Sequence, residues 1–438
     1  DDHDPDADVG GARRVVGVLP AVSRLPITTT MTDAASQPIA GRSRAALYTL
    51  MSVMFINIMG FGIVVPLLPF YAESFHANAW QIGLIFSAYS LGSFVGEPFW
   101  GRLSDRIGRK PVLIFTTLAN CACYGALAFA PSIAWAFGIR LLGGMAAGNG
   151  SVVQGYIADI SAVEERAGRM ARLGAAYNIG FILGPFVGGV LAKTSVGPIG
   201  FQIPLLAASA CGAASSLGVF LALRESRARR LSAEPQRSRW AMFDIAARHP
   251  VIGRLILLTF VAGVAFTGIE STFGLWAQHR FNWAPRDVGL CFGLSGLVSA
   301  VTNFLLTGPL SRRFGEARVL AVGMIGTAAT LALQPLTGGG WATYALLAAN
   351  SAFSSVAFPN IGAMMSGAAG EDEQGQILGL NNAAGAFARF VGPQLAGWMF
   401  AAVSIEGPWL AGAVIVAPAA LLALAAGRAG RREDPSLA

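Results

Sequence analysis

Long apolar stretches alternate with short polar ones from residue 45 to residue 427. Each apolar stretch is long enough to cross about 30 Å of hydrocarbon as an α-helix. A helix is the form in which such a segment satisfies its own backbone hydrogen bonds inside a bilayer. The pattern therefore predicts an all-α membrane protein with twelve transmembrane helices in two groups of six. The predicted helices cover residues 45–71, 80–100, 112–130, 133–158, 167–192, 199–223, 251–277, 286–310, 317–337, 341–366, 374–401 and 405–427.

The polar segments between and around these groups set the expected domain organisation. The segment before the first helix is polar and rich in Asp, which is typical of a disordered tail, and the longest internal gap contains many arginines. A short surface helix is expected in that gap, around residues 240–248. The predicted parts are a disordered cytoplasmic tail (1–43), a six-helix bundle (44–223), a cytoplasmic linker (224–250), a second six-helix bundle (251–427) and a cytoplasmic carboxyl-terminal tail (428–438).

Composition supports the membrane class and excludes several others. Of the 438 residues 54% are hydrophobic and 13% are charged, against about 25% charged in soluble domains, and the mean hydropathy is +0.56. The net charge of +7 comes from tails and loops without interleaved aromatic residues, so no nucleic-acid partner is expected. Cys121 and Cys123 lack the spacing and the companion ligands of a metal site. No nucleotide-binding loop is present, and we expect neither an enzyme nor a cofactor.

The distribution of basic residues predicts the orientation in the membrane. Of the 31 Lys and Arg residues, 26 fall in one set of polar segments, which includes both tails, and three fall in the other set. Because cytoplasmic segments carry the excess of Lys and Arg, we expect both termini on the cytoplasmic side of the cell inner membrane.

The two groups of helices repeat each other in sequence. Residues 80–84 lead into a helix that ends at residues 101–108, and residues 285–290 lead into one that ends at residues 308–315. The offset between the repeats is 206 at the start of this helix and 207 at its end. A duplication of this kind predicts pseudo-symmetric bundles with a substrate site between them. A further pair, at an offset of 208, is Gly184-Pro185 and Gly392-Pro393.

A charged turn joins the second and third predicted helices. Residues 101–110 read Gly-Arg-Leu-Ser-Asp-Arg-Ile-Gly-Arg-Lys, and such a turn must lie at a membrane surface. The stretch resembles the loop between helices 2 and 3 of major facilitator superfamily transporters, Gly-x-Leu-x-Asp-Arg-x-Gly-Arg-Lys/Arg, in every element. The resemblance implies the major facilitator fold and a charge cluster that latches the outward-facing state; the alternative is an ordinary cytoplasmic loop. The latch residues that it implies are Gly101, Asp105, Arg106, Gly108, Arg109 and Asp159.

The fifth predicted helix carries a stripe of small residues and a proline. Glycines recur every four positions, which gives a smooth face for close helix approach, and the proline can kink the helix. The stretch resembles the Gly-x-x-x-Gly-Pro-x-x-Gly-Gly element of drug/proton antiporters, which implies export, although helix packing alone explains the glycines equally well. The residues of this antiporter motif are Gly180, Gly184, Pro185, Gly188 and Gly189.

Ionisable residues inside predicted helices are candidates for proton coupling. Arg140 begins a stretch that resembles the Arg-x-x-x-Gly element of proton-coupled carriers; the alternative is a structural arginine bound to backbone carbonyls. Tetracycline-type efflux proteins, which residues 45–225 resemble, carry an aspartate where this chain has Asn57, which cannot titrate. Two acids expected to be buried, Glu270 and Glu97, can take over proton exchange, with Glu270 and Arg140 as the leading pair. Glu97 is also a candidate structural partner of the nearby loop cations.

Polar and aromatic residues on the predicted helices are candidates for lining a substrate cavity, with simple helix packing as the alternative for each. Arg389, expected to be a second buried cation, could pair with an acid or contact an anionic substrate. The cavity candidates are Asn57, Tyr177, Asn178, Phe266, Asn303, Asn350, Asn381 and Arg389.

These features lead to three hypotheses of function. The first is proton-coupled efflux of small amphipathic compounds or drugs by a secondary transporter. The second is a facilitator or proton-coupled importer of a metabolite such as a sugar or an organic anion, held by Arg140 and Arg389. The third is a non-transporting membrane sensor on the same scaffold. In each case we expect a monomer in a lipid bilayer with a small-molecule ligand; the first also requires protons as partners.

Overall fold

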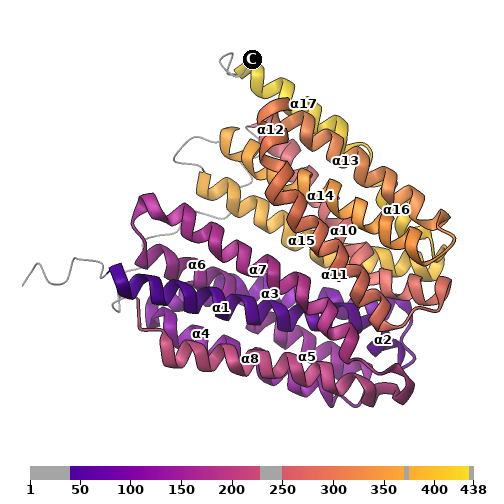
Figure 1. The fold of residues 1–438 in the computed structure, drawn as a ribbon, viewed down its shortest axis with the longest axis horizontal. Coiled ribbons are helices and arrows are strands. Elements are labelled where there is room, and N and C mark those ends of the chain that lie inside the picture. The colour runs from indigo at the N-terminus through magenta and orange to yellow at the C-terminus, as the bar shows by residue number, and fades with distance from the viewer. Residues whose placement is uncertain (1–39, 227–248, 369–373, 434–438) are drawn as a thin grey trace, which may run out of the picture. The chain divides into compact units, whose positions relative to one another are not determined.

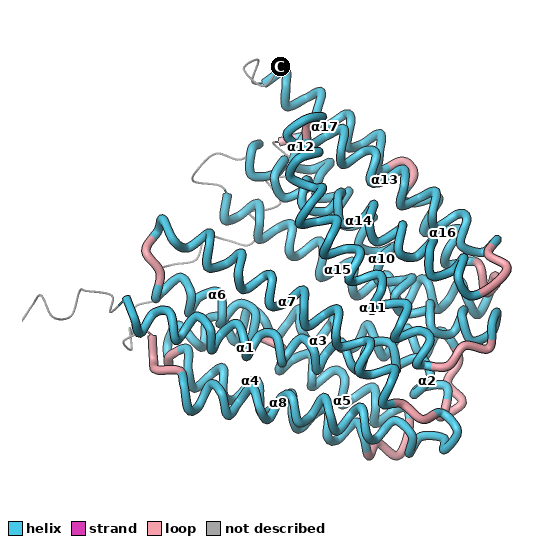
Figure 2. The backbone as a smooth tube through the Cα atoms, in the orientation of Figure 1, coloured by secondary structure: helices cyan, strands magenta, loops and turns pink. Residues whose placement is uncertain are grey.

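The computed structural model describes residues 40–226, 249–368 and 374–433. All regular secondary structure in these residues is helical (Figure 2). The first half (residues 40–226) contains α1 (Ala40–Val64), η1 (Val65–Leu67), α2 (Leu68–Glu73), α3 (Ala79–Ile107), α4 (Arg109–Ala128), α5 (Ile133–Ala146), α6 (Asn149–Ile160), α7 (Val163–Leu191), η2 (Thr194–Phe201) and α8 (Gln202–Ala222). The second half (residues 249–433) contains α10 (Pro250–Phe281), α11 (Pro285–Thr302), η3 (Asn303–Thr307), α12 (Gly308–Phe314), α13 (Glu316–Leu333), η4 (Gln334–Leu336), α14 (Gly340–Ala368), α15 (Gln374–Ala402), α16 (Gly407–Val416) and α17 (Ala419–Glu433).

The prediction of an all-α membrane protein is confirmed. Within the described residues, every predicted span coincides with one helix or with consecutive helical segments (Figure 1). Eight of these helical stretches are long and apolar enough to cross a membrane. The expected surface helix around residues 240–248 and most of the tail 1–43 lie outside the described residues, although α1 already begins at Ala40.

The charged stretch 101–110 is helical, so its prediction as a turn was wrong. Residues 101–107 form the last turns of α3, and Arg109 starts α4 directly after Gly108. Gly108 alone breaks the helix, with φ at 107°, a value that residues with a Cβ rarely adopt. The charges of this stretch therefore project from two helix ends that meet at one residue. We call this end of the helices the Arg109 end.

One predicted span, 133–158, is divided into α5 and α6. The break falls at Ala147 and Gly148, where the ring of Trp100 occupies the space that a Cβ on Gly148 would need. The indole N–H of Trp100 donates to the carbonyl of Met145 at 2.6 Å, which satisfies a carbonyl near the end of α5. A side chain from α3 thus stabilises this break.

A π-helical turn explains the change in offset between the two repeats. The second-half counterpart of α3 consists of α11, the π-helix η3 and α12. A π-turn accommodates one more residue than an α-turn, and the offset rises from 206 to 207 across it. Within this turn the side-chain hydroxyl of Thr307 donates to the backbone carbonyl of Thr302, five residues earlier, at 3.5 Å. The extra residue is therefore absorbed locally and the flanking helices keep the register of the first half.

The buried core joins the two halves at one end only. The largest cluster combines first-half residues such as Phe70 and Tyr71 with second-half residues such as Phe273, Trp276 and Trp409. Toward the Arg109 end the core separates into one cluster of first-half residues and one of second-half residues. Burial of apolar surface therefore holds the halves together at the end opposite to Arg109.

The π-turn predicts that the chain tolerates a deletion at one place. Removing Phe304, whose side chain is 86% exposed, should convert η3 into α-helix without rotating α12, at a cost of about 1–2 kcal/mol in stability. Removing Leu297 from α11 should rotate everything that follows by about 100° and prevent folding. Thermal unfolding of the two purified proteins tests this, and equal damage from both deletions would contradict it.

Candidate functional site

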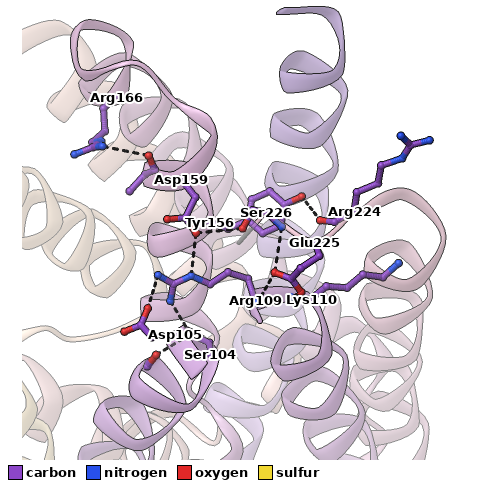
Figure 3. Close-up of polar contacts among 12 residues, drawn as sticks. Ser104, Asp105, Arg109, Lys110, Tyr156, Asp159, Arg166, Arg224, Glu225 and Ser226 are labelled. Atoms are coloured by element: carbon purple, nitrogen blue, oxygen red, sulfur yellow. Dashed lines mark hydrogen bonds and ion pairs between the residues drawn. The ribbon is translucent and has the colours of Figure 1, made fainter. Parts of the chain in front are cut away.

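A cluster of charged residues surrounds Arg109 at the start of α4 (Figure 3). Its guanidinium lies 2.7 Å from Asp105 and 3.2 Å from Asp159, and donates to the hydroxyl of Ser104 at 2.6 Å. The guanidinium fits against Gly155 of α6, where a Cβ would lie 2.5 Å from its central carbon. Arg109 is only 6% exposed, so two acids and a hydroxyl compensate its charge in a largely water-free position.

The other predicted latch residues differ in whether they contact the Arg109 cluster. Arg106 is exposed and makes no hydrogen bond or ion pair with any described residue, so it does not belong to the cluster seen here. Gly101 lies beside α6, where a Cβ would be in van der Waals contact with Ser151. The space next to Gly108 is filled by the carboxylate of Glu225, so a side chain at this position would meet both strain and a clash.

Glu225, which the sequence analysis did not identify, completes this cluster. Its carboxylate accepts hydrogen bonds from the backbone N–H groups of Arg109 at 2.8 Å and Lys110 at 3.1 Å, and so caps the first turn of α4 (Figure 3). A negative charge at a helix N-terminus is favourable. Next to it, Ser226 donates to Asp159 at 3.2 Å. Contacts between residues more than 60 positions apart give no local sequence signal, so only the fold reveals them.

The glycines of the predicted antiporter motif pack α7 against α1. A Cβ on Gly180 would lie 2.6 Å from the carbonyl oxygen of Phe55, and one on Gly184 would lie 2.6 Å from the Cα atom of Gly62. Gly188 meets the carbonyl of Ile63 in the same way. The predicted smooth face is thus a backbone-to-backbone contact between these helices.

Two equivalent contacts join the halves at the end opposite to Arg109. Gly83 of α3 packs on the carbonyl of Pro393 in α15, and a Cβ on Gly289 of α11 would lie 2.5 Å from the carbonyl oxygen of Pro185 in α7. The glycines are 206 positions apart and the prolines 208, so each contact is the repeat of the other. Both pairs bring backbones together without an intervening side chain.

A cavity lies mainly in the second half. Its α10 wall consists of Ala262, Ala265, Phe266, Ile269 and Glu270, spaced so that they share one helix face. Among the described residues, Glu270 is the only carboxylate that lines the cavity. The remaining lining residues come mostly from α11, α13 and α14, with Gly62, Val65, Phe181 and Pro185 from the first half.

The charged residues inside the helices are not grouped as the sequence suggested. Arg389 is within electrostatic reach of Glu270 and Glu97, whereas Arg140 stacks on the ring of Tyr89 at 4.3 Å. The structure therefore does not bring Glu270 and Arg140 together. Other described side chains do not cover Glu97 or Arg389, and both are exposed on the surface of the protein.

Both Arg140 and Gly144 of the Arg-x-x-x-Gly element contact Tyr89 of α3. Gly144 allows α5 to approach the backbone carbonyl of Tyr89, and Arg140, one turn earlier, covers the Tyr89 ring. Arg140 is 3% exposed and its Nε has no hydrogen-bond partner. Arg140 forms no ion pair with a described carboxylate, and contact with the face of the aromatic ring stabilises the cation instead.

Only some of the residues predicted to line a cavity do so in the structure. Asn350 and Phe266 line the cavity, and Asn350 also donates to Thr330 at 2.8 Å. Asn381 accepts a hydrogen bond from Thr259 at 2.7 Å, and Asn57 has an amide nitrogen without a partner. Apart from Arg389, the remaining candidates are Tyr177, Asn178 and Asn303, and all three are exposed.

Sequence reasoning missed the serines and most of the rings of the cavity. Ser295, Ser299, Ser351 and Ser354 line it together with Phe292 and Phe358. Serine and phenylalanine are common throughout the apolar segments, so nothing in the local sequence distinguishes these positions. Among the described residues, no group of three or more His, Cys, Asp and Glu side chains could hold a metal ion.

Comparisons with known proteins agree with this architecture. A sequence model of the Major Facilitator Superfamily matches residues 50–284 and again 255–437. Multidrug resistance protein 2 of Bacillus subtilis (strain 168) is 29% identical over 377 residues, which cover 84% of this chain and 92% of that protein. The class C tetracycline resistance protein of Escherichia coli is 28% identical over 383 residues, covering 85% and 95%.

The fold is also that of solved structures. A bacterial homolog of the human lysosomal transporter Spinster, in its inward-facing and unoccupied conformation, superposes with a TM-score of 0.73 and covers 89% of this chain and 98% of its own. At 15% identity this similarity concerns the fold alone.

The cap provided by Glu225 predicts a stability effect. Glu225→Ala removes the acceptor of two backbone N–H groups and should cost about 1–2 kcal/mol. Glu165→Ala is the matched control, because Glu165 is 61% exposed in its side chain and pairs with Arg169 one turn away, which is worth about 0.3–0.5 kcal/mol. Thermal unfolding compares them; equal losses would show that the cap contributes nothing.

The contacts of Gly83 and Gly289 predict a shift between conformations. Valine at either position would overpack the junction by about 1–3 kcal/mol and should favour separation of the halves at this end. Spin labels on residues 74–78 and 282–284 should report longer distances in both variants. Gly138→Val is the control, since nothing lies within 4 Å of that position. Distances that match the wild type in both variants would refute this.

Proposed function

The chain belongs to the Major Facilitator Superfamily, and we propose that it is a proton-coupled exporter of small amphipathic compounds that works by alternating access. Relatives that are named for multidrug and tetracycline resistance match more than four fifths of its length, which supports export of drug-like molecules. The antiporter motif in α7 supports the same direction of transport.

The cavity around Glu270 carries this proposal. Of the described residues that line this cavity, Glu270 is the one carboxylate, among apolar, aromatic and hydroxyl side chains. An ionisable residue in a membrane helix is a functional candidate by default. Aromatic rings suit the apolar part of an amphipathic compound, and a carboxylate suits a positive charge or a proton. In this mechanism Glu270 releases its proton before a cationic substrate binds, and the next proton displaces that substrate on the other side.

The contacts between halves suggest which state the structure represents. By the excess of basic residues we take the Arg109 end as cytoplasmic. The halves share a core only at the other end, and the hydrogen-bond and ion-pair partners described above for Arg109 all lie in the first half. We infer a state open to the cytoplasm, in which the Arg109 cluster waits for the second half to close on it. Separation of the halves at the glycine contacts would then open the end opposite to Arg109.

A second candidate function is transport of an organic anion. Arg389 is exposed, and no carboxylate among the described residues lies within 4.0 Å of it, so it could hold a substrate carboxylate. Arg140 does not support this function, since it is buried against Tyr89.

The family and the distribution of charge support a proposal for the membrane location and the orientation of the chain. We place the protein in the cell inner membrane with both termini in the cytoplasm, acting as a monomer. Lipid, protons and a small-molecule substrate are its partners, and it catalyses no chemical reaction of its own.

Proton movement in proteoliposomes tests the proposed function. Addition of tetraphenylphosphonium should release protons from wild-type vesicles, and Glu270→Gln should abolish the release because glutamine cannot exchange a proton. Glu97→Gln should retain it, since Glu97 does not line the cavity. Unchanged release in Glu270→Gln would refute the role of Glu270, and flux of an organic anion without proton movement would favour the second candidate.

A further inference from the structure

We propose that the wall of the Glu270 cavity formed by α11 and α14 is a hydrogen-bonding subsite. It takes a hydroxyl, carbonyl or amide group of a cationic amphiphile whose positive charge lies at Glu270. This inference rests on the proposed function, because it assumes that the cavity holds the substrate, and it adds the chemistry by which the site selects among cations.

The central observation is the hydroxyl of Ser295. This residue lines the cavity from α11 and is 6% exposed, yet its Oγ has no hydrogen-bond partner. Serine and threonine in helices ordinarily donate to the carbonyl four residues earlier. Thr267, Thr330 and Ser355 do so in this protein, at 2.8, 2.9 and 2.7 Å. A buried hydroxyl without such a bond is destabilising and calls for an explanation.

Neighbouring polar residues on the same wall are already engaged. Ser299 shares a hydrogen bond with Ser355 at 2.5 Å, and Ser354 shares one with Thr327 at 3.2 Å. Ser351 of α14 also lines the cavity, and its hydroxyl makes no hydrogen bond with any described residue. The two hydroxyl groups left for a ligand therefore come from two helices that pack against each other.

The other walls of the cavity indicate which further chemical groups a ligand should carry. Glu270 and Phe266 lie on the cavity face of α10, and Phe266 meets Phe358 edge to face with ring centroids 6.4 Å apart. A ligand that fills the cavity can place its charge at Glu270, an aromatic group against these rings and a polar group at Ser295. A purely hydrophobic cation of equal size leaves Ser295 unsatisfied. The site should therefore prefer the cation that carries a hydrogen-bonding substituent.

A matched pair of ligands tests the subsite in the full-length protein. Tetraphenylphosphonium and (4-hydroxyphenyl)triphenylphosphonium differ by one hydroxyl, and their Kd values can be measured by calorimetry with protein in lipid nanodiscs. Wild type should bind the hydroxylated cation about three- to tenfold more tightly, as expected for one neutral hydrogen bond. Ser295→Ala should abolish this preference, and Ser295→Thr, which keeps the hydroxyl, should retain it.

Controls separate this inference from the proposed function. Ser299→Ala, one turn along α11, should keep the preference because the Ser299 hydroxyl is engaged by Ser355. Ser295→Cys, nearly isosteric with serine, replaces Ser295→Ala if the latter does not fold, and should also lose the preference. Equal Kd values in wild type, or a preference that survives in the Ser295→Ala/Ser351→Ala double variant, would overturn the subsite while cation binding stands. Binding of neither cation by wild type would overturn the proposed function and the subsite with it.

Discussion

The close approach of helix backbones at one end of the molecule is the contact on which the arrangement of the two halves depends. Gly83 meets the carbonyl of Pro393, and Gly289 meets that of Pro185. No side chain separates these backbones, and a continuous apolar core surrounds them. Such a junction is tightly packed but contains few hydrogen bonds among the described residues. One of them is donated by the Ser87 hydroxyl to the carbonyl of Phe390 at 2.6 Å. The junction can therefore open as a unit, which alternating access requires.

The duplicated chain uses its two copies differently. The first half keeps the charged cluster in which Arg109 binds Asp105 and Asp159, while the second half has Arg312 where the first has Asp105. The second half in turn supplies most of the described lining of the cavity, including Glu270, its one carboxylate there. Under the proposed function, the first half would supply the latch and the second half would recognise the ligand. The π-turn η3 lets the two differ in length while their helices remain equivalent.

Buried charge is handled in two physically distinct ways. Arg109 is compensated by carboxylates at the edge of the first half, whereas Arg140 is compensated by the ring of Tyr89 in its interior. The first arrangement is electrostatic and can be exchanged for other partners; the second is fixed by the packing that Gly144 permits. This difference supports a switching role for Arg109 and a structural role for Arg140.

The sequence by itself determined the class of protein, the position of every predicted span and the repeat. These depend on composition and on local periodicity, because a bilayer requires long apolar helices. It also identified Glu270, since an acid in an apolar run is conspicuous wherever the run folds. Only the tertiary structure decided that Glu270 lies near Arg389 rather than Arg140, that Glu225 caps α4 and that Ser295 is left without a partner. Each of these depends on residues from different helices meeting in space, and no local pattern records such contacts.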